Sequence, residues 1–217
     1  MDEIIVRATR AVASYPRLRM LAILTHGEQT PTQMAQTLHL PLCAISLHLR
    51  VLVTANLACR RKSGARCYYR AESPYDATTF SGKLAAWLYA LLKTAAVRER
   101  KHPGLLKVRD ASAKPDEALY RVIFEAATAF TDLRRLQLLR YLGRQKSADA
   151  QDLEKSLSMS RQALSRHTSK LVRRGYAQSQ RAGRGVLYRP AHEFKTPLHR
   201  RLFEIIWAAW EQTSRTL

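Results

Sequence analysis

The sequence predicts a mainly α-helical protein with small β-hairpins, built from two similar halves. The 217 residues are 46% hydrophobic and 25% charged, which is ordinary for a globular protein of one or two domains. Residues 34–70 align without a gap with residues 153–189, and ten of the 37 aligned positions are identical. In both halves, apolar residues first recur at helical spacing and then alternate over two short segments. An ungapped match of this kind predicts two domains of one fold in tandem.

The boundary between the halves is predicted at a basic segment with turn-forming residues. Pro103, Gly104 and Pro115 lie there among several lysines and arginines, a composition typical of linkers. The sequence thus predicts one domain over residues 1–98, a basic linker over 99–115 and a second domain over 116–217. Two small shifts extend the alignment upstream and pair Leu18–Leu21 with Leu133–Leu136, Gly27 with Gly143, and Asp2–Glu3 with Asp116–Glu117.

Three helices are predicted at the start of the first domain. Apolar residues recur at helical spacing over Ile4–Ser14 and Arg17–Thr25, and Pro16 between them would interrupt a single helix. A short third helix follows. Thr30, followed three residues later by Gln33, is typical of a capping box at a helix start.

A turn at Leu40–Leu42 leads to the next helix, predicted over Leu42–Ala55. Its apolar stripe is expected at Ile45, Leu49 and Leu52, and at Leu164, Leu171 and Val172 in the second half. His48 and His167 lie on the inner side of these helices. We expect them to be packed, hydrogen-bonded core residues, with no chemistry of their own.

The periodicity then changes from helical to alternating, which predicts a β-hairpin in each half. The strands are expected over residues 57–61 and 66–70, and over 176–180 and 186–189, with a basic, glycine-containing tip in each hairpin. A last helix follows over 79–98 and over 197–214. Its tryptophans recur at helical spacing, so we expect them in the core or in a helix–helix interface.

This order of elements is the plan of a winged helix-turn-helix domain. The residues also resemble the ArsR/SmtB family of bacterial transcriptional regulators. The resemblance rests on Ser46–Leu52, the wing at 60–66 and Tyr68–Arg70 in the first half, and on Ser165–Leu171, Gly175–Tyr176 and Leu187–Arg189 in the second. It implies a sequence-specific DNA-binding regulator, most often a repressor. Because the family is dimeric through its first and last helices, it also implies a pseudo-dimer with pseudo-two-fold symmetry formed within one chain.

The charge balance points to double-stranded DNA as the partner. There are 37 Lys and Arg against 17 Asp and Glu, a formal net charge of +20, and basic side chains that face DNA displace counterions from its phosphates. A recognition helix in the major groove would add base reading. The candidate DNA-binding residues are Ser160, Arg161, Gln162, Ser165, Arg166, Ser169, Lys170, Arg181 and Arg184 in the second half, and Ser46, Leu47, Arg50, Arg60, Arg61, Lys62 and Arg66 in the first.

The two candidate recognition helices differ in chemistry. The second carries arginine and glutamine in its first turns, where arginine can bond guanine and glutamine can bond adenine. The first has Leu42, Cys43 and Leu47 in the same places, which offer few hydrogen bonds. We therefore expect an asymmetric or imperfectly palindromic binding site.

No metal and no cofactor are expected. Many members of the resembling family bind metal through Cys-x-Cys on the helix before the recognition helix, but the corresponding stretch here, Gln33–Leu38, has no cysteine. The spacing of His192, Glu193 and His199 does not define a coordination sphere either. What the protein senses is therefore left open.

Three cysteines allow a redox alternative. Cys43 near a helix N-terminus could have a lowered pKa, and Cys59 and Cys67 on the two strands of one hairpin would be cross-strand neighbours, which together suggest a redox-responsive regulator. The competing interpretation is that all three are small buried hydrophobic residues.

Other classes are less compatible with the sequence. There is no glycine-rich phosphate loop, no GxSxG and no cluster of carboxylates, so we expect no enzyme activity. A protein-interaction module, using the apolar first recognition helix, and an architectural DNA binder without sequence preference remain alternatives. No apolar stretch reaches the roughly 20 residues of a membrane span, and Asp2 and Glu3 follow Met1 where a signal peptide would be basic. We expect a cytoplasmic, nucleoid-associated protein of a bacterium or archaeon, acting as a single chain or as a homodimer.

Overall fold

The computed structural model describes residues 1–101, 115–183 and 185–215. The first half contains α1 (Asp2–Val12), α2 (Tyr15–Leu24), α3 (Pro31–Leu38), α4 (Leu42–Thr54), β1 (Cys59–Ser63), β2 (Arg66–Arg70) and α5 (Phe80–Lys101). The second half contains α6 (Pro115–Thr128), α7 (Leu133–Gln145), β3 (Ala148–Asp149), α8 (Ala150–Leu157), α9 (Arg161–Arg174), β4 (Ala177–Ala182), β5 (Gly185–Pro190) and α10 (Pro197–Arg215). The predicted fold class, mainly helical with small antiparallel hairpins, is confirmed.

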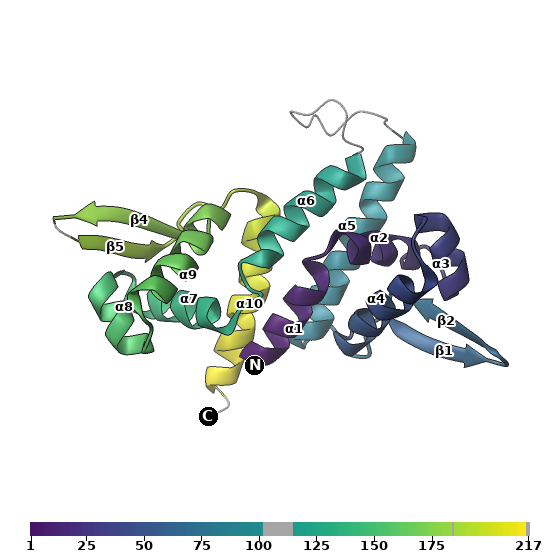
Figure 1. The fold of residues 1–217 in the computed structure, drawn as a ribbon, viewed down its shortest axis with the longest axis horizontal. Coiled ribbons are helices and arrows are strands. Elements are labelled where there is room, and N and C mark those ends of the chain that lie inside the picture. Colours follow the sequence, from purple (N-terminus) through teal and green to yellow (C-terminus); the bar gives the residue numbers. More distant parts are fainter. Residues whose placement is uncertain (102–114, 184, 216–217) are drawn as a thin grey trace.

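The outer helices of both halves meet in the middle of the molecule, and the two hairpins lie at opposite ends (Figure 1). Helix α6 packs against α10, α1 and α5, and α10 also packs against α5. Buried side chains from both halves belong to one hydrophobic core cluster. The described parts of the two halves are therefore joined by packing over a shared apolar core.

The buried positions of the first two helices recur in the second half at a constant spacing of 118 residues. Leu18, Met20, Leu21 and Leu24 of α2, and Leu136, Leu138, Leu139 and Leu142 of α7, are all at most 1% exposed. The sequence-based pairing of Leu18–Leu21 with Leu133–Leu136 is therefore wrong by three residues. A leucine-rich helix matches itself nearly as well after a shift of three or four residues, because its buried face returns at that interval.

The other two upstream pairings are also inconsistent with a spacing of 118 residues. Gly143, paired with the loop residue Gly27, lies inside α7, where an added Cβ would collide with the ring of Trp207. At a spacing of 118, Asp2 corresponds to Tyr120 and not to Asp116. Helix α6 thus begins before the position that matches the start of α1.

The local helix signals are largely confirmed. Thr30 and Gln33 form the expected capping box: the Thr30 amide donates to Gln33 Oε1 at 2.8 Å, and the Gln33 amide donates to Thr30 Oγ1 at 3.3 Å. The stripe of α4 is buried as predicted. In α9, however, Val172 is only half-buried, and Thr168 takes its place in the core by donating its hydroxyl to the Leu164 carbonyl at 2.8 Å.

The short strand β3 was not predicted. Ala148 and Asp149 pair with Tyr188 and Leu187 of β5, which gives a three-stranded sheet in the order β3-β5-β4. In the first half, a single bridge joins Gln29 to Tyr69 at the matching place. The inner strand of each hairpin is thereby attached to the segment that precedes the helix-turn-helix, which fixes the position of the hairpin relative to α4 or α9.

Most of the predicted linker lies outside the described residues. Helix α5 runs to Lys101 and α6 begins at Pro115, so both ends of the predicted 99–115 segment are helical. No single described helix is long and apolar enough to cross a membrane, although α3 and α4, bent by 114° relative to each other, pass that length and composition test as a pair.

An ion pair and a hydrogen bond at the N-terminus link the first half to the second. One carboxylate oxygen of Asp2 lies 2.9 Å from the Arg140 guanidinium of α7, and the other accepts a hydrogen bond from the Trp210 indole of α10 at 2.8 Å. The Arg140 guanidinium also lies 5.7 Å from the centre of the Trp210 ring. The beginning and the end of the described chain are thus held together by side chains.

Two further contacts from α1 to the second half are not reciprocated. Thr9 donates its hydroxyl to the Phe130 carbonyl at 2.9 Å, and Arg10 donates to the Thr131 carbonyl at 2.8 Å. The positions that match them in α6 are Ala127, which has no side-chain donor, and Thr128. The contact between the halves is therefore only approximately symmetric.

Candidate nucleic-acid interface

Two side-chain caps fix the helix-turn-helix of the second half. Asp149 accepts a hydrogen bond from the Asp152 amide at 2.8 Å at the start of α8, and Ser160 accepts one from the Ala163 amide at 3.3 Å at the start of α9. Between the helices, Ser158 adopts the left-handed conformation that commonly ends a helix. These caps define where α9 begins and therefore which residues its first turn presents.

Helix α9 turns its polar side away from the core. Its buried side is formed by Leu164, His167, Thr168 and Leu171. The predicted residues on the other side are exposed: Arg161, Gln162, Ser165, Arg166 and Ser169. Arg161 lies 3.1 Å from Glu154 and is paired with it. Gln162 and Arg166 have no hydrogen-bond or ion-pair partner within the described chain, so they are the long polar side chains available for base edges.

Helix α4 presents a different surface. Leu42 is 50% exposed and Leu47 is 58% exposed. Ser46 is exposed but donates its hydroxyl to the Leu42 carbonyl at 2.9 Å, and Pro41 at the N-cap position provides no side-chain cap. Arg50 is exposed one turn further on. We call each helix-turn-helix with its hairpin a head: the first contains α3, α4, β1 and β2, and the second contains α8, α9, β4 and β5. The two heads therefore differ in chemistry in the folded protein as well as in the sequence.

The first hairpin is strongly basic, but one of its arginines is already paired. The predicted wing residues are all exposed: Arg60, Arg61, Lys62 and Arg66. Arg61 donates two hydrogen bonds, of 3.1 and 2.6 Å, to the carboxylate of Glu28. Its guanidinium group also lies 5.2 Å from the centre of the Tyr68 ring. This pairing raises the pKa of Arg61 and lowers the pKa of Glu28. Arg60, Lys62 and Arg66 are therefore the wing cations available to phosphates.

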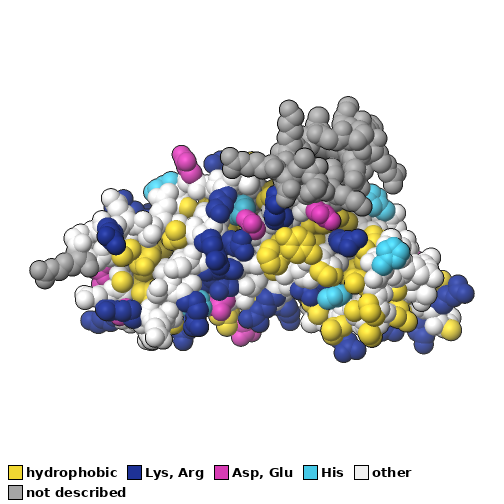
Figure 2. All heavy atoms as spheres, turned by 45° about the horizontal axis from the view of Figure 1, so that its top comes forward, with side chains coloured by type: hydrophobic (Ala, Val, Ile, Leu, Met, Phe, Trp, Pro, Cys, Tyr) yellow, Lys and Arg dark blue, Asp and Glu magenta, His cyan; other side chains and the backbone are white. Residues whose placement is uncertain are grey.

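The second hairpin contributes one described candidate. Arg181 on β4 is exposed and pairs across the hairpin with Val186. Arg184, also predicted as a contact, lies outside the described residues. On the face drawn in Figure 2, Lys and Arg side chains clearly outnumber Asp and Glu side chains, as DNA binding requires.

In each half, a groove separates the recognition helix from its hairpin. The groove of the first half, about 600 Å³, has Leu42 and Ser46 on one side and Arg66 on the other. The groove of the second half, about 590 Å³, has Arg161 and Ser165 of α9 on one side and the strand β5 on the other. Helix and hairpin thus present two edges with a hollow between them, the arrangement in which a winged helix-turn-helix faces a duplex.

The cross-strand placement of Cys59 and Cys67 is wrong. In the register of the hairpin, Cys59 faces Arg70 and Cys67 faces Lys62, because the two cysteines are displaced by three positions along the strands. Burial, followed by the charge of Glu72, raises the pKa of the Cys59 thiol, which disfavours the reactive thiolate. All three cysteines are free, and only Cys43 is exposed. The structure thus removes the cross-strand pair from the redox alternative, whereas Cys43 is exposed in the first turn of α4, as that alternative expects.

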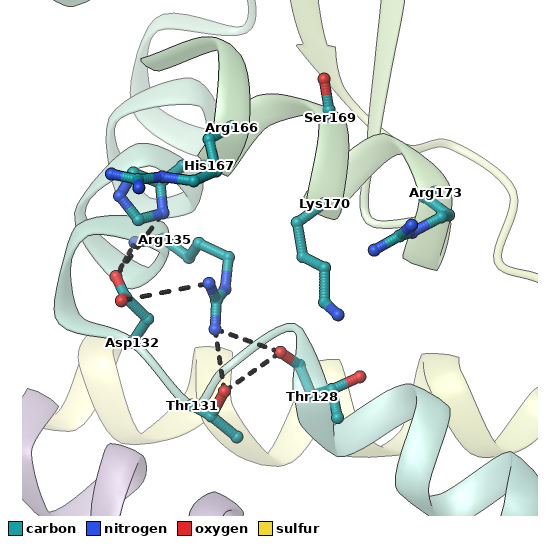
Figure 3. A pocket seen from close by; sticks show the side chains of 9 residues that line it. All are labelled: Thr128, Thr131, Asp132, Arg135, Arg166, His167, Ser169, Lys170 and Arg173. Atoms are coloured by element: carbon teal, nitrogen blue, oxygen red, sulfur yellow. Dashed lines mark hydrogen bonds and ion pairs between the residues drawn. The ribbon is translucent and has the colours of Figure 1, made fainter. Parts of the chain in front are cut away.

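Two half-buried arginines that sequence reasoning missed hold the loop between the first two helices of each half. Arg135 donates to the carbonyls of Ala129 and Thr128 at 2.7 and 3.2 Å, and Figure 3 shows its contact with Thr128. Arg17 does the same for Ala11 and Arg10, at 2.6 and 2.8 Å. Both satisfy carbonyls left open at a helix end. Burial lowers the pKa of both guanidinium groups. Once the spacing of 118 residues is known, the pair can be recognised, since both arginines then occupy one aligned position.

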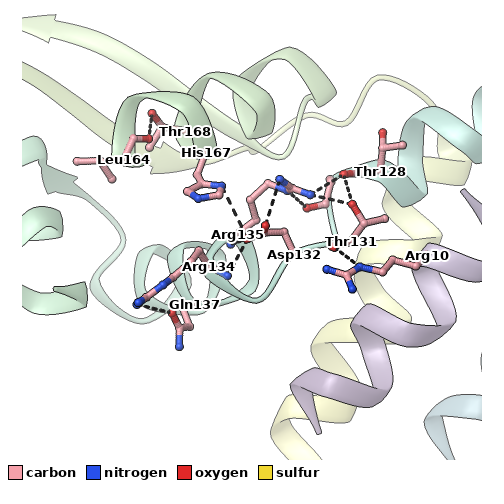
Figure 4. Close-up of polar contacts among 11 residues, drawn as sticks. Arg10, Thr128, Thr131, Asp132, Arg134, Arg135, Gln137, Leu164, His167 and Thr168 are labelled. Carbon is pink, nitrogen blue, oxygen red and sulfur yellow. Dashed lines mark hydrogen bonds and ion pairs between the residues drawn. The ribbon is translucent and has the colours of Figure 1, made fainter. Parts of the chain in front are cut away.

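His167 is buried as expected, but its ring is poorly satisfied. Its Nδ1 atom lies 3.7 Å from a carboxylate oxygen of Asp132, a contact marked in Figure 4 that is too long for a hydrogen bond. This buried nitrogen has no hydrogen-bond partner within the described residues. Asp132 itself accepts a hydrogen bond from the Arg134 amide at 2.9 Å and caps α7. Burial is the largest cause that lowers the pKa of His167; Asp132 opposes it, and Arg135 and Arg166 add to it.

Acidification is expected to destabilise the protein through this histidine. The unfolded chain takes up a proton near pH 6.5, whereas folded His167 takes it up only at lower pH, so its contribution to stability is complete above that value and is lost as the pH falls. His167→Gln should therefore flatten the decline of the urea midpoint between about pH 7 and pH 5. His199, whose pKa burial also lowers, would keep part of the decline. The exposed control His26→Gln should leave it unchanged, and an equally steep decline in His167→Gln would contradict the assignment.

Within residues 1–101, 115–183 and 185–215, no three His, Cys, Asp or Glu side chains lie close enough to hold a metal ion. The residues available to this surface are hydrogen-bond donors, hydroxyls and cations. Such groups fit phosphate oxygens and base edges better than they fit a metal.

Comparisons with known proteins agree with this description. Residues 131–185 match the MarR family. Over 66 residues the chain is 36% identical to the HTH-type transcriptional regulator Rv2034 of Mycobacterium tuberculosis, and this match covers 30% of the chain and 62% of that regulator. The chain thus spans less than two thirds of the length of this curated relative.

Two solved structures are also similar in part. One is the solution structure of a homodimeric winged helix-turn-helix DNA-binding domain, Mb0332 from Mycobacterium bovis, described as a possible ArsR-family regulator: identity is 28%, coverage is 44% of this chain and 81% of that one, and the TM-score is 0.35. The other is the antimony-specific transcriptional repressor AntR, with 24% identity, coverage of 51% and 93%, and a TM-score of 0.36.

The fold and the exposed face of α9 define a winged helix-turn-helix protein, of the class to which DNA-binding transcriptional regulators belong. The residues that match the MarR family run from Thr131 to Gly185 and so contain α7 to α9 and the strand β4. The sequence resemblance pointed to ArsR/SmtB instead. The two agree on a winged helix-turn-helix regulator and differ on the family within that class.

Proposed function

We propose that the chain is a sequence-specific DNA-binding transcriptional regulator, acting as a repressor, with two non-identical heads and no metal site. The observation that carries the proposal is the face of α9, where Gln162 and Arg166 are exposed and have no hydrogen-bond or ion-pair partner within the described residues. Arginine and glutamine are the side chains that bond guanine and adenine in the major groove. A repressor would act by occupying the site that the transcription machinery needs.

In this proposal, residues 1–98 and 116–217 are two winged-helix domains that pair within one chain. Helices α1, α5, α6 and α10 would form the interface that a family dimer forms between two chains. Support comes from their mutual packing and from the contacts that Asp2, Thr9 and Arg10 make with the second half. One chain would then contact one binding site, with the wing residues on phosphates and the chain located at the chromosome of a bacterial or archaeal cell.

Selection of bound sequences from a random DNA library, at two salt concentrations, tests the proposal directly. We expect a motif with two unlike half-sites about one helical turn apart, bound by one chain as measured by light scattering. Two equivalent half-sites bound by a single chain would contradict unlike heads. Salt-sensitive binding without a motif would indicate an architectural protein and overturn sequence-specific regulation.

A second candidate function rests on Leu42 and Leu47. Two leucines exposed by half or more on one recognition helix also suit a partner protein. In that case the first head would bind a protein while α9 binds DNA. Measuring binding by the first head at increasing salt distinguishes the two functions, because an apolar protein contact does not weaken with ionic strength as phosphate contacts do.

A further inference from the structure

A pocket of about 800 Å³ lies on the inner flank of α9, against the start of α7 and the α6–α7 junction (Figure 3). Its lining residues are Thr128, Thr131, Asp132, Arg135, Arg166, His167, Ser169, Lys170 and Arg173. Four of the nine are permanent cations and one is an acid. The pocket is thus distinct from the groove between α9 and its hairpin, and it is strongly positive.

The positive charge of the pocket is not compensated. Lys170, Arg166 and Arg173 have no ion-pair or hydrogen-bond partner within the described parts of the chain. The carboxylate of Asp132 is already engaged, since it accepts a hydrogen bond from the Arg134 amide and lies 4.0 Å from the Arg135 guanidinium. An incoming anion would therefore meet three cations without partners in the described residues and an acid that already contacts Arg134 and Arg135.

The surroundings of Lys170 disfavour its positive charge. Burial lowers the pKa of its ammonium group, and the nearby cations Arg174, Arg173 and Arg135 lower it further. Clustered like charges disfavour one another, and an anion among them removes this penalty while gaining charge-assisted hydrogen bonds. The buried Nδ1 of His167, which lacks a partner within the described residues, adds a further unsatisfied polar atom to the wall.

The fold does not require these charges. At a spacing of 119 residues, the first half has Leu47, Val51 and Thr54 where α9 has Arg166, Lys170 and Arg173. The structural residues around them are kept: His48 matches His167, and Arg17 makes the same carbonyl contacts as Arg135. The cation cluster is therefore an addition to the second half that stability alone does not explain.

We propose that this pocket binds a phosphate-type oxyanion through Lys170 and Arg173, with Arg135 and Arg166 adding to the positive potential. The same chemistry fits a phosphate of the DNA backbone beside the recognition helix and a free phosphate. The first source rests on the proposed function, and the second does not. A free anion would occupy the place of a DNA phosphate and would weaken DNA binding.

The test uses substitutions that the protein itself suggests. The double variant Lys170→Val with Arg173→Thr installs the side chains of the first half at the same places. Lys170→Gln keeps a polar side chain nearly as long as lysine and serves as a second variant if the double variant is not folded. The control combines Lys93→Val with Arg7→Thr, at exposed positions of α5 and α1, and so removes the same two charges outside the pocket.

The first arm measures thermal melting of the full chain without DNA, with inorganic phosphate replacing chloride at equal ionic strength. Ligand that binds only the folded state raises the melting temperature. We expect a saturating rise in the wild type and in the control with Lys93→Val and Arg7→Thr. The double variant should show only the gradual, non-saturating rise that phosphate gives proteins in general. The second arm measures how DNA affinity changes with salt, where loss of one phosphate contact should reduce the log–log slope by about 0.9.

The outcomes separate the two sources of phosphate. A reduced slope in the double variant, relative to the control with Lys93→Val and Arg7→Thr, assigns the pocket to the DNA backbone. A saturating phosphate-dependent rise in melting temperature, lost in the double variant without a change of slope, assigns it to a free anion. If neither arm distinguishes the double variant from the control, the proposal is overturned. If the wild type binds no DNA, the proposed function fails while the first arm still decides the pocket.

Discussion

Replacing Tyr176 by alanine should lower the free energy of unfolding by about 3–5 kcal/mol, the range for large aromatic side chains removed from cores. Tyr176 is 1% exposed and lies where α9 ends. Its ring centre lies 4.6 Å from that of Phe130 and 5.9 Å from that of Phe194, and its hydroxyl donates to the His199 carbonyl at 3.3 Å. One side chain thus joins the end of α9 to the loop that follows α6 and to α10.

Urea unfolding followed by circular dichroism measures this loss. Tyr176→Phe keeps the ring and should lose only about 1 kcal/mol, the net value of one hydrogen bond. Tyr75→Ala, at a residue 49% exposed, should change stability by no more than about 0.5 kcal/mol. If Tyr176→Ala behaved like Tyr75→Ala, the aromatic core of the second half would be packed differently from this structure.

Arg166→Leu should reduce the preference for the selected DNA motif by about ten- to a hundredfold at one half-site, since a bidentate contact to a base contributes about 1–3 kcal/mol of discrimination. Leucine is the residue of the first head at this position, Leu47, so the change makes the two heads alike at this one position. We expect the other half-site to be read as before. Competition binding with the selected duplex and with duplexes altered at either half-site gives the two preferences separately.

The matched control is Arg7→Leu, at an exposed position of α1 outside both heads and both hairpins. It removes the same charge and should leave the preference unchanged. An equal loss of affinity for selected and altered duplexes in Arg166→Leu would show that Arg166 contacts phosphate and does not read a base. The reciprocal change, Leu47→Arg, should add salt-sensitive affinity to the first head.

Local signals in the sequence were sufficient for most of the fold. The capping box of Thr30 and Gln33 is a contact between residues three apart, and the stripe of Ile45, Leu49 and Leu52 needs only the period of a helix. The register of the first two helices could not be fixed in this way. A leucine-rich pattern fits itself at several shifts, and only the three-dimensional burial of Leu136 to Leu142 chooses among them.

The candidate site was predictable in composition but not in pairing. The exposure of Gln162 and Arg166 follows from the stripe on the opposite side of α9. Arg61 is paired with Glu28, and Arg161 with Glu154. Each glutamate lies outside the strand or helix that carries its arginine, so no periodicity in the sequence predicts these pairs. The displaced cysteines illustrate the same limit, since strand register depends on the turn of the hairpin and on its pairing partner. From the sequence, Arg135 would be taken for an exposed charge, because no local pattern shows that it donates hydrogen bonds to the carbonyls at the end of α6.

Asp2 contacts Arg140 and Trp210 of the same chain, and a contact within one chain does not depend on the concentration of the protein in the cell. Association between separate subunits is lost on dilution, whereas association between parts of one chain depends only on an effective concentration set by the chain itself. On the proposed function, α1 pairs with α6, α7 and α10 of the same molecule, so the paired arrangement would persist at any abundance. On the proposed function, a single copy would be a complete regulator, and occupancy of its site would rise in proportion to protein number and not to its square.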